Sequence, residues 1–183
     1  MGYLRFCAAG QLECKITDVA APAVAMSTAR WKMLYEINDD VNSKIIAVTD
    51  QQLYGEAERW AYPKDKGDCE DFVLLKKREL DAADFAPATL LITVVQDGHG
   101  QGHGVLSVRT DDGDFVLGKR RNSVLRRYDA NCQFVKPQST EDPQQWLSLE
   151  IQETPDAAKP ASHSVNTNKN PAKAIGSGTE KVM

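Results

Sequence analysis

An α+β fold is predicted by the order in which two kinds of periodicity follow each other along the 183 residues. Two segments with the apolar spacing of amphipathic helices come first, over residues 28–45 and 69–82. Segments with the two-residue alternation of strands come after them and are separated by glycine-rich turns. Helices followed by a meander of strands indicate N-terminal helices packed on an antiparallel sheet.

The two helices have recognisable starts. The chain begins irregularly through Pro22, and Ser27 or Thr28 can then cap the first helix. One face of that helix recurs at spacings of three and four residues: Trp31, Leu34, Asn38, Val41 and Ile45. An aromatic-rich loop is predicted over residues 49–66. Gly67 and Asp68 then lead into the second helix.

The strands are predicted over residues 89–96, 103–110, 114–117 and 132–135. The first is rich in β-branched and apolar residues, and a turn over residues 97–102 separates it from the second. Asp111, Asp112 and Gly113 form a hairpin signal between the second and third strands. Paired positions of that hairpin should therefore sum to roughly 222–225.

One folded domain is expected over residues 1–151. Residues 152–183 contain no Phe, Tyr or Trp and are dominated by Pro, Ala, Ser, Asn and Lys, so we expect a disordered tail there. The net charge of −4 excludes the basic footprint of a nucleic-acid-binding protein. The richest apolar stretch, residues 88–95, is far shorter than the ~20 residues of a membrane span.

The four cysteines have different settings, and no C-x-x-C pair indicates a structural zinc site. Cys7 and Cys14 are spaced so that a disulfide can join them, and Cys132 reads as a small buried strand residue. The N-terminus has one base and no long apolar core, so it is not a signal peptide as it stands. Either the protein stays inside the cell or a leader has been removed.

The third cysteine is the strongest candidate for chemistry. Cys69 lies in the first turn of the second predicted helix, where unpaired N–H groups and the helix dipole stabilise a thiolate. The neighbouring carboxylates oppose this effect, and a buried core cysteine is the alternative. His103 opens a strand after a glycine-rich turn and is suited to act as the base of a cysteine nucleophile.

A third group usually orients such a histidine. The hairpin register places residues near 119–122 opposite His103, so we expect the orienting group to come from residues 118–122. Asn122 lies in this window and can orient an imidazole, while Asp114 is nearer the turn and less well placed.

These residues belong to a longer series of motifs that resembles the bacterial transglutaminase-like cysteine peptidases. The resemblance covers nearly all of residues 3–149. Its motifs, in chain order, are Phe6-Cys7, Glu13-Cys14, Ala29-Arg30-Trp31, Val48-Thr49-Asp50, Leu53-Tyr54-Gly55, Glu58-Arg59-Trp60-Ala61-Tyr62-Pro63, Gly67-Asp68-Cys69-Glu70-Asp71, Leu90-Leu91-Ile92-Thr93-Val94-Val95, Gly102-His103-Gly104-Val105-Leu106 and Gly113-Asp114-Phe115-Val116-Leu117.

The resemblance implies a papain/transglutaminase-like fold with a Cys-His-Asp centre, in which Cys69 is the nucleophile and His103 the base. The family's aspartate follows the Val-Leu of the next strand in a Leu-Asp-Asn pattern. In this sequence the pattern reads Leu117-Gly118-Lys119, so the aspartate position is occupied by Gly118. Asn122 or a water is the candidate substitute, and without one we expect a weak or inactive peptidase.

The resemblance also implies cofactors, partners and a compartment. The family's best-known type is a periplasmic protease that cleaves surface adhesins and binds calcium beside the nucleophile. Asp68, Glu70 and Asp71 are the matching calcium ligands here, although Lys66 replaces an acidic residue of that type. A periplasmic or secreted protein with a protein substrate, such as an adhesin, is expected, with the cytoplasm as the alternative.

Two functions follow from the sequence. One is a cysteine peptidase that forms an acyl-enzyme on Cys69, and transglutaminase chemistry shares that first half-reaction. The other is a catalytically weak or inactive member that binds a protein segment without cutting it, and Gly118 is the residue that favours this alternative.

Overall fold

The computed structural model describes residues 2–16, 21–119 and 122–149, apart from the side chain of Leu12. Within this part of the chain the predicted α+β architecture is confirmed. The predicted tail, residues 152–183, lies outside the described residues, so the division of the chain into domain and tail stays a prediction.

A five-stranded antiparallel sheet forms the centre of the fold. Its strand order is β6-β5-β4-β3-β7. The strands are β3 (Leu90–Asp97), β4 (Gly102–Thr110), β5 (Gly113–Leu117), β6 (Leu125–Arg126) and β7 (Cys132–Pro137). Leu106 pairs with Leu117, so paired positions of the β4–β5 hairpin sum to 223, within the expected range.

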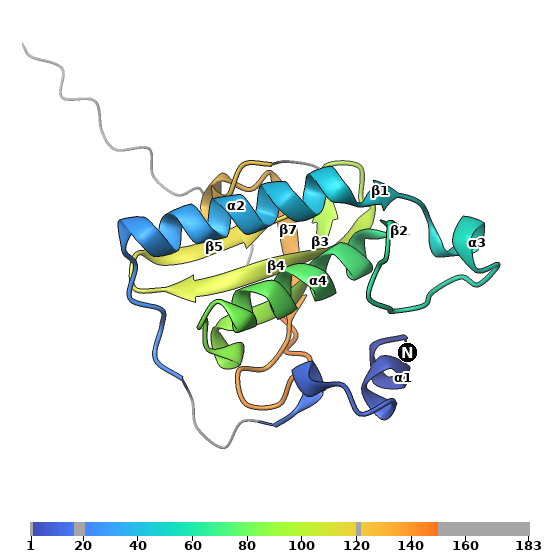
Figure 1. Ribbon diagram of the computed structural model, residues 1–183, viewed down its shortest axis with the longest axis horizontal. Coiled ribbons are helices and arrows are strands. Elements are labelled where there is room, and N and C mark those ends of the chain that lie inside the picture. Colours follow the sequence, from blue (N-terminus) through green and yellow to red (C-terminus); the bar gives the residue numbers. More distant parts are fainter. Residues whose placement is uncertain (1, 17–20, 120–121, 150–183) are drawn as a thin grey trace, which may run out of the picture. The chain divides into compact units, whose positions relative to one another are not determined.

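Two helices cover one face of the sheet. Helix α2 (Thr28–Lys44) and helix α4 (Cys69–Ala82) lie side by side across β4 and β5, as Figure 1 shows. Ser27 caps α2 by accepting a hydrogen bond from the backbone N–H of Arg30. The core between the layers includes Leu34, Leu74, Leu106 and Leu117, none of which is exposed. Burial of these apolar side chains is the main driving force for joining helices and sheet.

The sequence missed several short elements. The N-terminal segment, predicted to be irregular, contains helix α1 (Gly2–Ala8) and a 3₁₀ turn (Leu12–Cys14). The predicted loop 49–66 contains helix α3 (Asp50–Leu53), and its end pairs as strand β2 (Lys66–Gly67) with β1 (Ile46–Ala47). These elements have two to seven residues, which is too short to show a periodicity.

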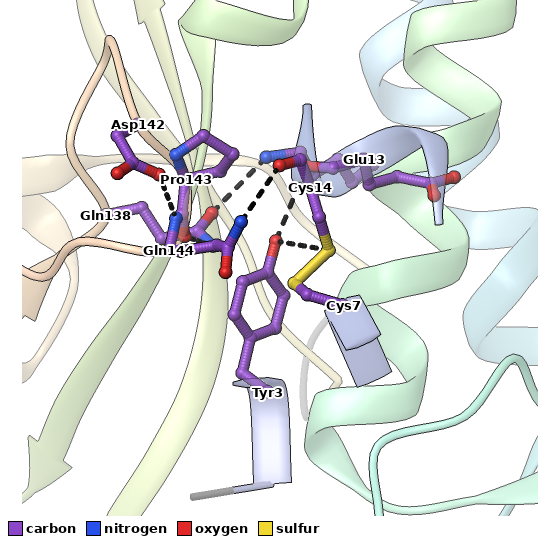
Figure 2. Close-up of a disulfide and its surroundings, with 9 residues drawn as sticks. Tyr3, Cys7, Glu13, Cys14, Gln138, Asp142, Pro143 and Gln144 are labelled. Atoms are coloured by element: carbon purple, nitrogen blue, oxygen red, sulfur yellow. Dashed lines mark hydrogen bonds between the residues drawn. A yellow bond between two sulfur atoms is a disulfide. The ribbon is translucent and has the colours of Figure 1, made fainter. Parts of the chain in front are cut away.

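A disulfide joins Cys7 to Cys14 and closes the N-terminal segment. Figure 2 shows the bridge beside Tyr3, whose hydroxyl lies 3.7 Å from the Cys14 sulfur. Gln144 donates a side-chain hydrogen bond to the carbonyl of Cys14 at 3.5 Å. The ring of Tyr3 also packs edge-on against Trp60, with 5.0 Å between ring centroids. The bridged segment thereby rests on the loop that precedes α4.

A buried lysine ties α4 to α2 and to the end of β5. The Lys76 ammonium donates to the side-chain oxygens of Asn38 and Asn42, each at 2.7 Å, and to the carbonyl of Gly118 at 3.1 Å. Burial lowers the pKa of Lys76 to about 7, while the three accepting oxygens favour its charged form. The backbone at Gly118 is thus held by a buried donor.

We predict that Lys76→Met destabilises the protein by about 2–4 kcal/mol, because one buried and two half-buried oxygens lose a donor that methionine cannot replace. Chemical denaturation of the parent and the variant measures this difference in free energy of unfolding. Lys32→Met is the matched control, since the Lys32 side chain is 71% exposed. A Lys76→Met variant as stable as the parent would show that the three hydrogen bonds of Lys76 do not stabilise the fold.

Candidate active site

The nucleophile candidate lies at the first residue of α4. Asp68 is the N-cap, and its carboxylate accepts hydrogen bonds from the backbone N–H groups of Glu70 at 3.1 Å and Asp71 at 3.3 Å. This arrangement satisfies two of the donors that a helix start leaves unpaired. The helix therefore begins at Cys69, as the sequence predicted.

The thiol of Cys69 is not set up as a thiolate in this structure. It donates to the carboxylate of Glu70 at 2.9 Å. Burial raises the pKa of Cys69 to about 12, the negative charge of Glu70 adds to this, and a hydrogen bond from the backbone of Gly104 acts against it. Burial first, and then the Glu70 carboxylate, therefore outweigh the helix dipole at Cys69.

His103 lies near the start of β4, and its partner is an aspartate from the preceding strand. His103 Nε2 and Asp97 Oδ2 are 3.0 Å apart, and the two side chains are 17% and 15% exposed. Asp97 is the last residue of β3, which pairs with β4. Asp97 was not predicted as a site residue, because it reads as part of the turn and the orienting group was expected from the β4–β5 hairpin.

The register of the β3–β4 hairpin shows how Asp97 could have been found from the sequence. Val95 pairs with His103, so Asp97 lies two residues further along the neighbouring strand and on the same face. Diagonal neighbours of this kind are within reach of each other when their side chains are long enough.

Cys69, His103 and Asp97 all line one cavity of about 370 Å³. Apolar side chains make up much of its remaining wall, and they are Val95, Val105, Val116, Leu125 and Ala130. The structure therefore brings together the two catalytic candidates that the sequence named, with a third polar residue, around an apolar hollow.

Asn122, the expected orienting residue, contacts helix α2. Its side-chain oxygen accepts a hydrogen bond from Asn42 at 3.3 Å, and its backbone carbonyl accepts one from Asn38 at 2.8 Å. The interaction with His103 that we expected from residues 118–122 is made by Asp97 instead. Among the described residues no contact joins Asn122 to His103, and a catalytic role for Asn122 stays a prediction.

Gly118 lies on the opposite side of His103 from Asp97. It follows β5 and also lines the cavity. A Cβ built at Gly118 would meet only the Val105 side chain, at an ordinary 3.8 Å. The position therefore has room for a side chain, and the absence of the family's aspartate is not forced by packing.

Three carboxylates meet at the start of α4. Asp50, Asp68 and Asp71 each offer an oxygen, and these oxygens lie within 4.8 Å of one another. Asp50 is 3% exposed and Asp71 is fully buried. The Asp50 Oδ1 and Asp71 Oδ2 atoms have no hydrogen-bond partner in the described structure. Buried carboxylate oxygens without a donor are costly, which makes this cluster fit a hard cation such as calcium.

The electrostatics of the cluster agree with its geometry. Burial raises the pKa of Asp71 to about 7 and that of Asp68 to about 6, and it also raises the pKa of Asp50. Repulsion between neighbouring carboxylates adds to each of these shifts. Each carboxylate keeps one oxygen in place through the backbone, with Asp50 accepting from Arg59 and Asp71 from Ala61.

The cluster differs from the expected ligand set of Asp68, Glu70 and Asp71 in one residue. Asp50 joins it from the start of α3, where Thr49 caps the helix with a capping box. Glu70 is directed to the Cys69 thiol. Lys66, whose charge we expected near the site, is exposed on β2. The Val48-Thr49-Asp50 motif was visible in the sequence, but the chain distance to Cys69 concealed its role.

A half-buried cysteine thiol and an imidazole paired with a carboxylate line one cavity of an α+β scaffold, which is the arrangement that a thiol hydrolase needs. The profile of the bacterial transglutaminase-like cysteine proteinases (BTLCP) matches residues 1–154 of this chain. The chain therefore belongs to that family, a family of cysteine peptidases, as the sequence resemblance indicated.

Solved structures give the same fold. LapG of Legionella pneumophila in its calcium-bound form is 23% identical, with a TM-score of 0.52, over 59% of this chain and 64% of that chain. The EGTA-treated form is 22% identical, with a TM-score of 0.51, over 59% and 62%. The chain thus spans less than two thirds of the LapG structures that it matches. No curated protein matches the chain.

Among the described residues, no helix is both long and apolar enough to cross a membrane.

We predict that Gly67→Ala destabilises the protein, because an added Cβ would lie 2.7 Å from the Cβ of Asp71 and 2.8 Å from its Oδ2. Moving Asp71 would disturb the start of α4, and overpacking of this kind costs about 1–3 kcal/mol. Denaturant unfolding measures the loss. Gly98→Ala is the control, since nothing lies within 4 Å of a Cβ at Gly98. Equal stability of the two variants would show that Asp71 is not confined by Gly67.

Proposed function

We propose that this protein is a cysteine peptidase that uses Cys69 as its nucleophile and His103 as its general base. The observation that carries the proposal is that both side chains line one apolar cavity while His103 is held by a carboxylate. Membership in a family of cysteine peptidases supports the same reaction class. A peptide or protein is therefore the proposed substrate.

The reaction proceeds in two halves. The Cys69 sulfur attacks the carbonyl carbon of the scissile bond, and the thiol proton passes to His103. His103 then protonates the leaving amine nitrogen, and the C–N bond breaks to leave a thioester on Cys69. Water attacks the thioester carbonyl, gives a proton to His103 and releases the carboxylic acid, while the sulfur leaves and regains a proton. An amine in place of this water would give transglutamination.

The cavity suggests what part of the substrate lies beside the scissile bond. Its floor is formed by Val95, Val105 and Val116, which pack together as an apolar cluster. An apolar substrate side chain gains free energy by leaving water for such a surface. We propose a protein substrate that presents a small or medium apolar residue there, with surface adhesins as the class that the family resemblance implies.

Calcium is the proposed cofactor, held by Asp50, Asp68 and Asp71. Two oxygens of this cluster lack donors, and hard oxygen ligands suit calcium. The solved relatives include a calcium-bound LapG. Asp68 and Asp71 lie in the same helical turn as Cys69, so the bound ion would place positive charge near the nucleophile.

A periplasmic or secreted location is proposed on independent grounds. The disulfide between Cys7 and Cys14 is of a kind that persists in oxidising compartments. A thiol count on the denatured, unreduced protein isolated from its native host tests this proposal. Two free thiols per chain support export, and four indicate the cytoplasmic alternative.

A protein-binding module without catalysis is the second candidate. Gly118 and the hydrogen bond that holds the Cys69 thiol to Glu70 favour it. Iodoacetamide labelling below pH 7, with calcium present, separates the two candidates. Labelling faster than that of free cysteine supports the peptidase, and labelling at the rate of free cysteine or slower supports the binding module.

We predict that Cys69→Ala abolishes peptide cleavage while the free energy of unfolding changes by no more than ~1 kcal/mol, because only a partly exposed sulfur is removed. Mass spectrometry of a peptide library incubated with each protein measures cleavage. Cys132→Ala is the control for removing the other free cysteine. Cleavage by Cys69→Ala at the parental rate would eliminate Cys69 as the nucleophile.

We also predict that millimolar calcium raises the melting temperature of the parent, because a ligand that binds only the folded state stabilises it. EGTA should reverse the increase. Asp71→Asn should remove the increment, since it takes a charge from the buried cluster. Asp65→Asn is the matched control, because Asp65 is exposed and lies just before β2, outside the cluster. An unchanged melting temperature of the parent at 100-fold excess of calcium would contradict the site.

A further inference from the structure

His103 lies on β4, which has β3 on one side and β5 on the other. The paired part of β5 ends at Leu117, opposite Leu106, and Gly118, which follows it, has no side chain. β3 pairs with His103 itself through Val95, and Asp97 Oδ2 lies 3.0 Å from His103 Nε2. The imidazole therefore has a carboxylate partner, although glycine occupies the position of the family's aspartate.

The Asp97 carboxylate is held in a fixed orientation by the turn that joins β3 to β4. Its Oδ1 atom accepts hydrogen bonds from the backbone N–H groups of His99 at 2.9 Å and Gln101 at 3.0 Å. The backbone N–H of Asp97 donates to the carbonyl of Gln101 at 3.0 Å. Because Oδ1 is committed to the turn, Oδ2 is the oxygen directed to His103.

We propose that Asp97 is the positioning residue of His103 and that it takes over, from the opposite neighbouring strand, the role of the aspartate that Gly118 replaces. The inference rests on the proposed peptidase function. A carboxylate at Nε2 keeps the ring proton on that nitrogen and leaves Nδ1 with a lone pair to accept the proton of the Cys69 thiol. The same carboxylate stabilises the imidazolium that forms during attack.

Asp97→Asn is the sharpest variant because asparagine preserves the turn. Its amide oxygen can accept from the His99 and Gln101 N–H groups, while its NH₂ group replaces the oxygen at Nε2. That NH₂ donates to the ring, so the ring proton moves to Nδ1 and the nitrogen needed by the thiol is blocked. In serine proteases the same change lowers turnover by roughly four orders of magnitude.

We expect kcat of the full-length protein with calcium to fall by roughly 10²–10⁴-fold in Asp97→Asn, with KM within about threefold of the parent. The substrate is a peptide from the library that the parent cleaves. Asp142→Asn is the matched control, because the Asp142 carboxylate also accepts from a backbone N–H two residues on, that of Gln144 at 2.9 Å. Unchanged kcat in Asp97→Asn, with Cys69→Ala inactive, would overturn the role of Asp97 and leave the peptidase function standing.

The tautomer of His103 gives a second readout that needs no activity. Nitrogen-15 NMR of histidine-labelled protein, assigned with a His103→Gln spectrum, should show the Nε2–H form in the parent and the Nδ1–H form in Asp97→Asn. If the parent cleaves nothing but this change of tautomer occurs, the positioning by Asp97 is supported and the peptidase function fails. An identical tautomer in both proteins would overturn the positioning.

A second-site variant tests whether a carboxylate at position 118 can replace the carboxylate of Asp97. Gly118→Asp has room at its Cβ, as described above. We expect Gly118→Asp combined with Asp97→Asn to regain at least tenfold of the lost kcat and to return the Nε2–H tautomer. Gly118→Asp alone should change kcat by less than threefold, because Asp97 already provides the carboxylate. A tenfold gain in the single variant would overturn the proposal that Asp97 fills this role.

Discussion

The hydrogen bonds between the Asp68 carboxylate and the first N–H groups of α4 determine where the helix begins, and the functional groups depend on that start. With Asp68 as the cap, Cys69 takes the first helical position and Asp71 the third. A start one residue later would rotate each of these side chains by about 100° around the helix axis. The thiol would then leave the cavity, and Asp71 would leave the carboxylate cluster.

The helix start gathers more negative charge than the scaffold alone can stabilise. Asp50 reaches the cluster because the capped α3 follows directly after β1, and β1 pairs with the residues just before α4. Backbone N–H groups satisfy one oxygen of each buried aspartate, yet one oxygen on Asp50 and one on Asp71 remain without a donor. Protons or a cation must balance such a group of carboxylates. The carboxylate cluster next to Cys69 thus lowers local stability, as functional sites commonly do.

The sequence predicted the long periodic elements and those candidate site residues that can be recognised from their immediate neighbours in the chain. Both main helices, the strand meander and a register sum of roughly 222–225 followed from spacing alone, and the observed sum of 223 lies in that range. Cys69 followed from its place at a helix start, and His103 from its place after a glycine-rich turn. Asp97 and Asp50 were missed for a different reason. Each takes its place through pairing with a neighbouring element, and their own surroundings read as a turn and a loop. Trp31, which the spacing placed on the core-facing side of the first helix, is 40% exposed and packs edge-on against Phe115.

Antiparallel sheet geometry explains how a histidine can keep a carboxylate partner after its usual source is lost. His103 pairs with Val95 of β3, so Asp97 is a diagonal neighbour on the same face. The paired part of β5 ends at Leu117, opposite Leu106, so a carboxylate from that side would come from the residues that follow the strand. On either side, the chain after the strand has to fix the carboxylate. The β3–β4 turn does so through two backbone N–H groups, whereas the chain after Gly118 is held by Lys76 through its backbone carbonyl. A carboxylate at 118 would need its own support, while the one at 97 already has it.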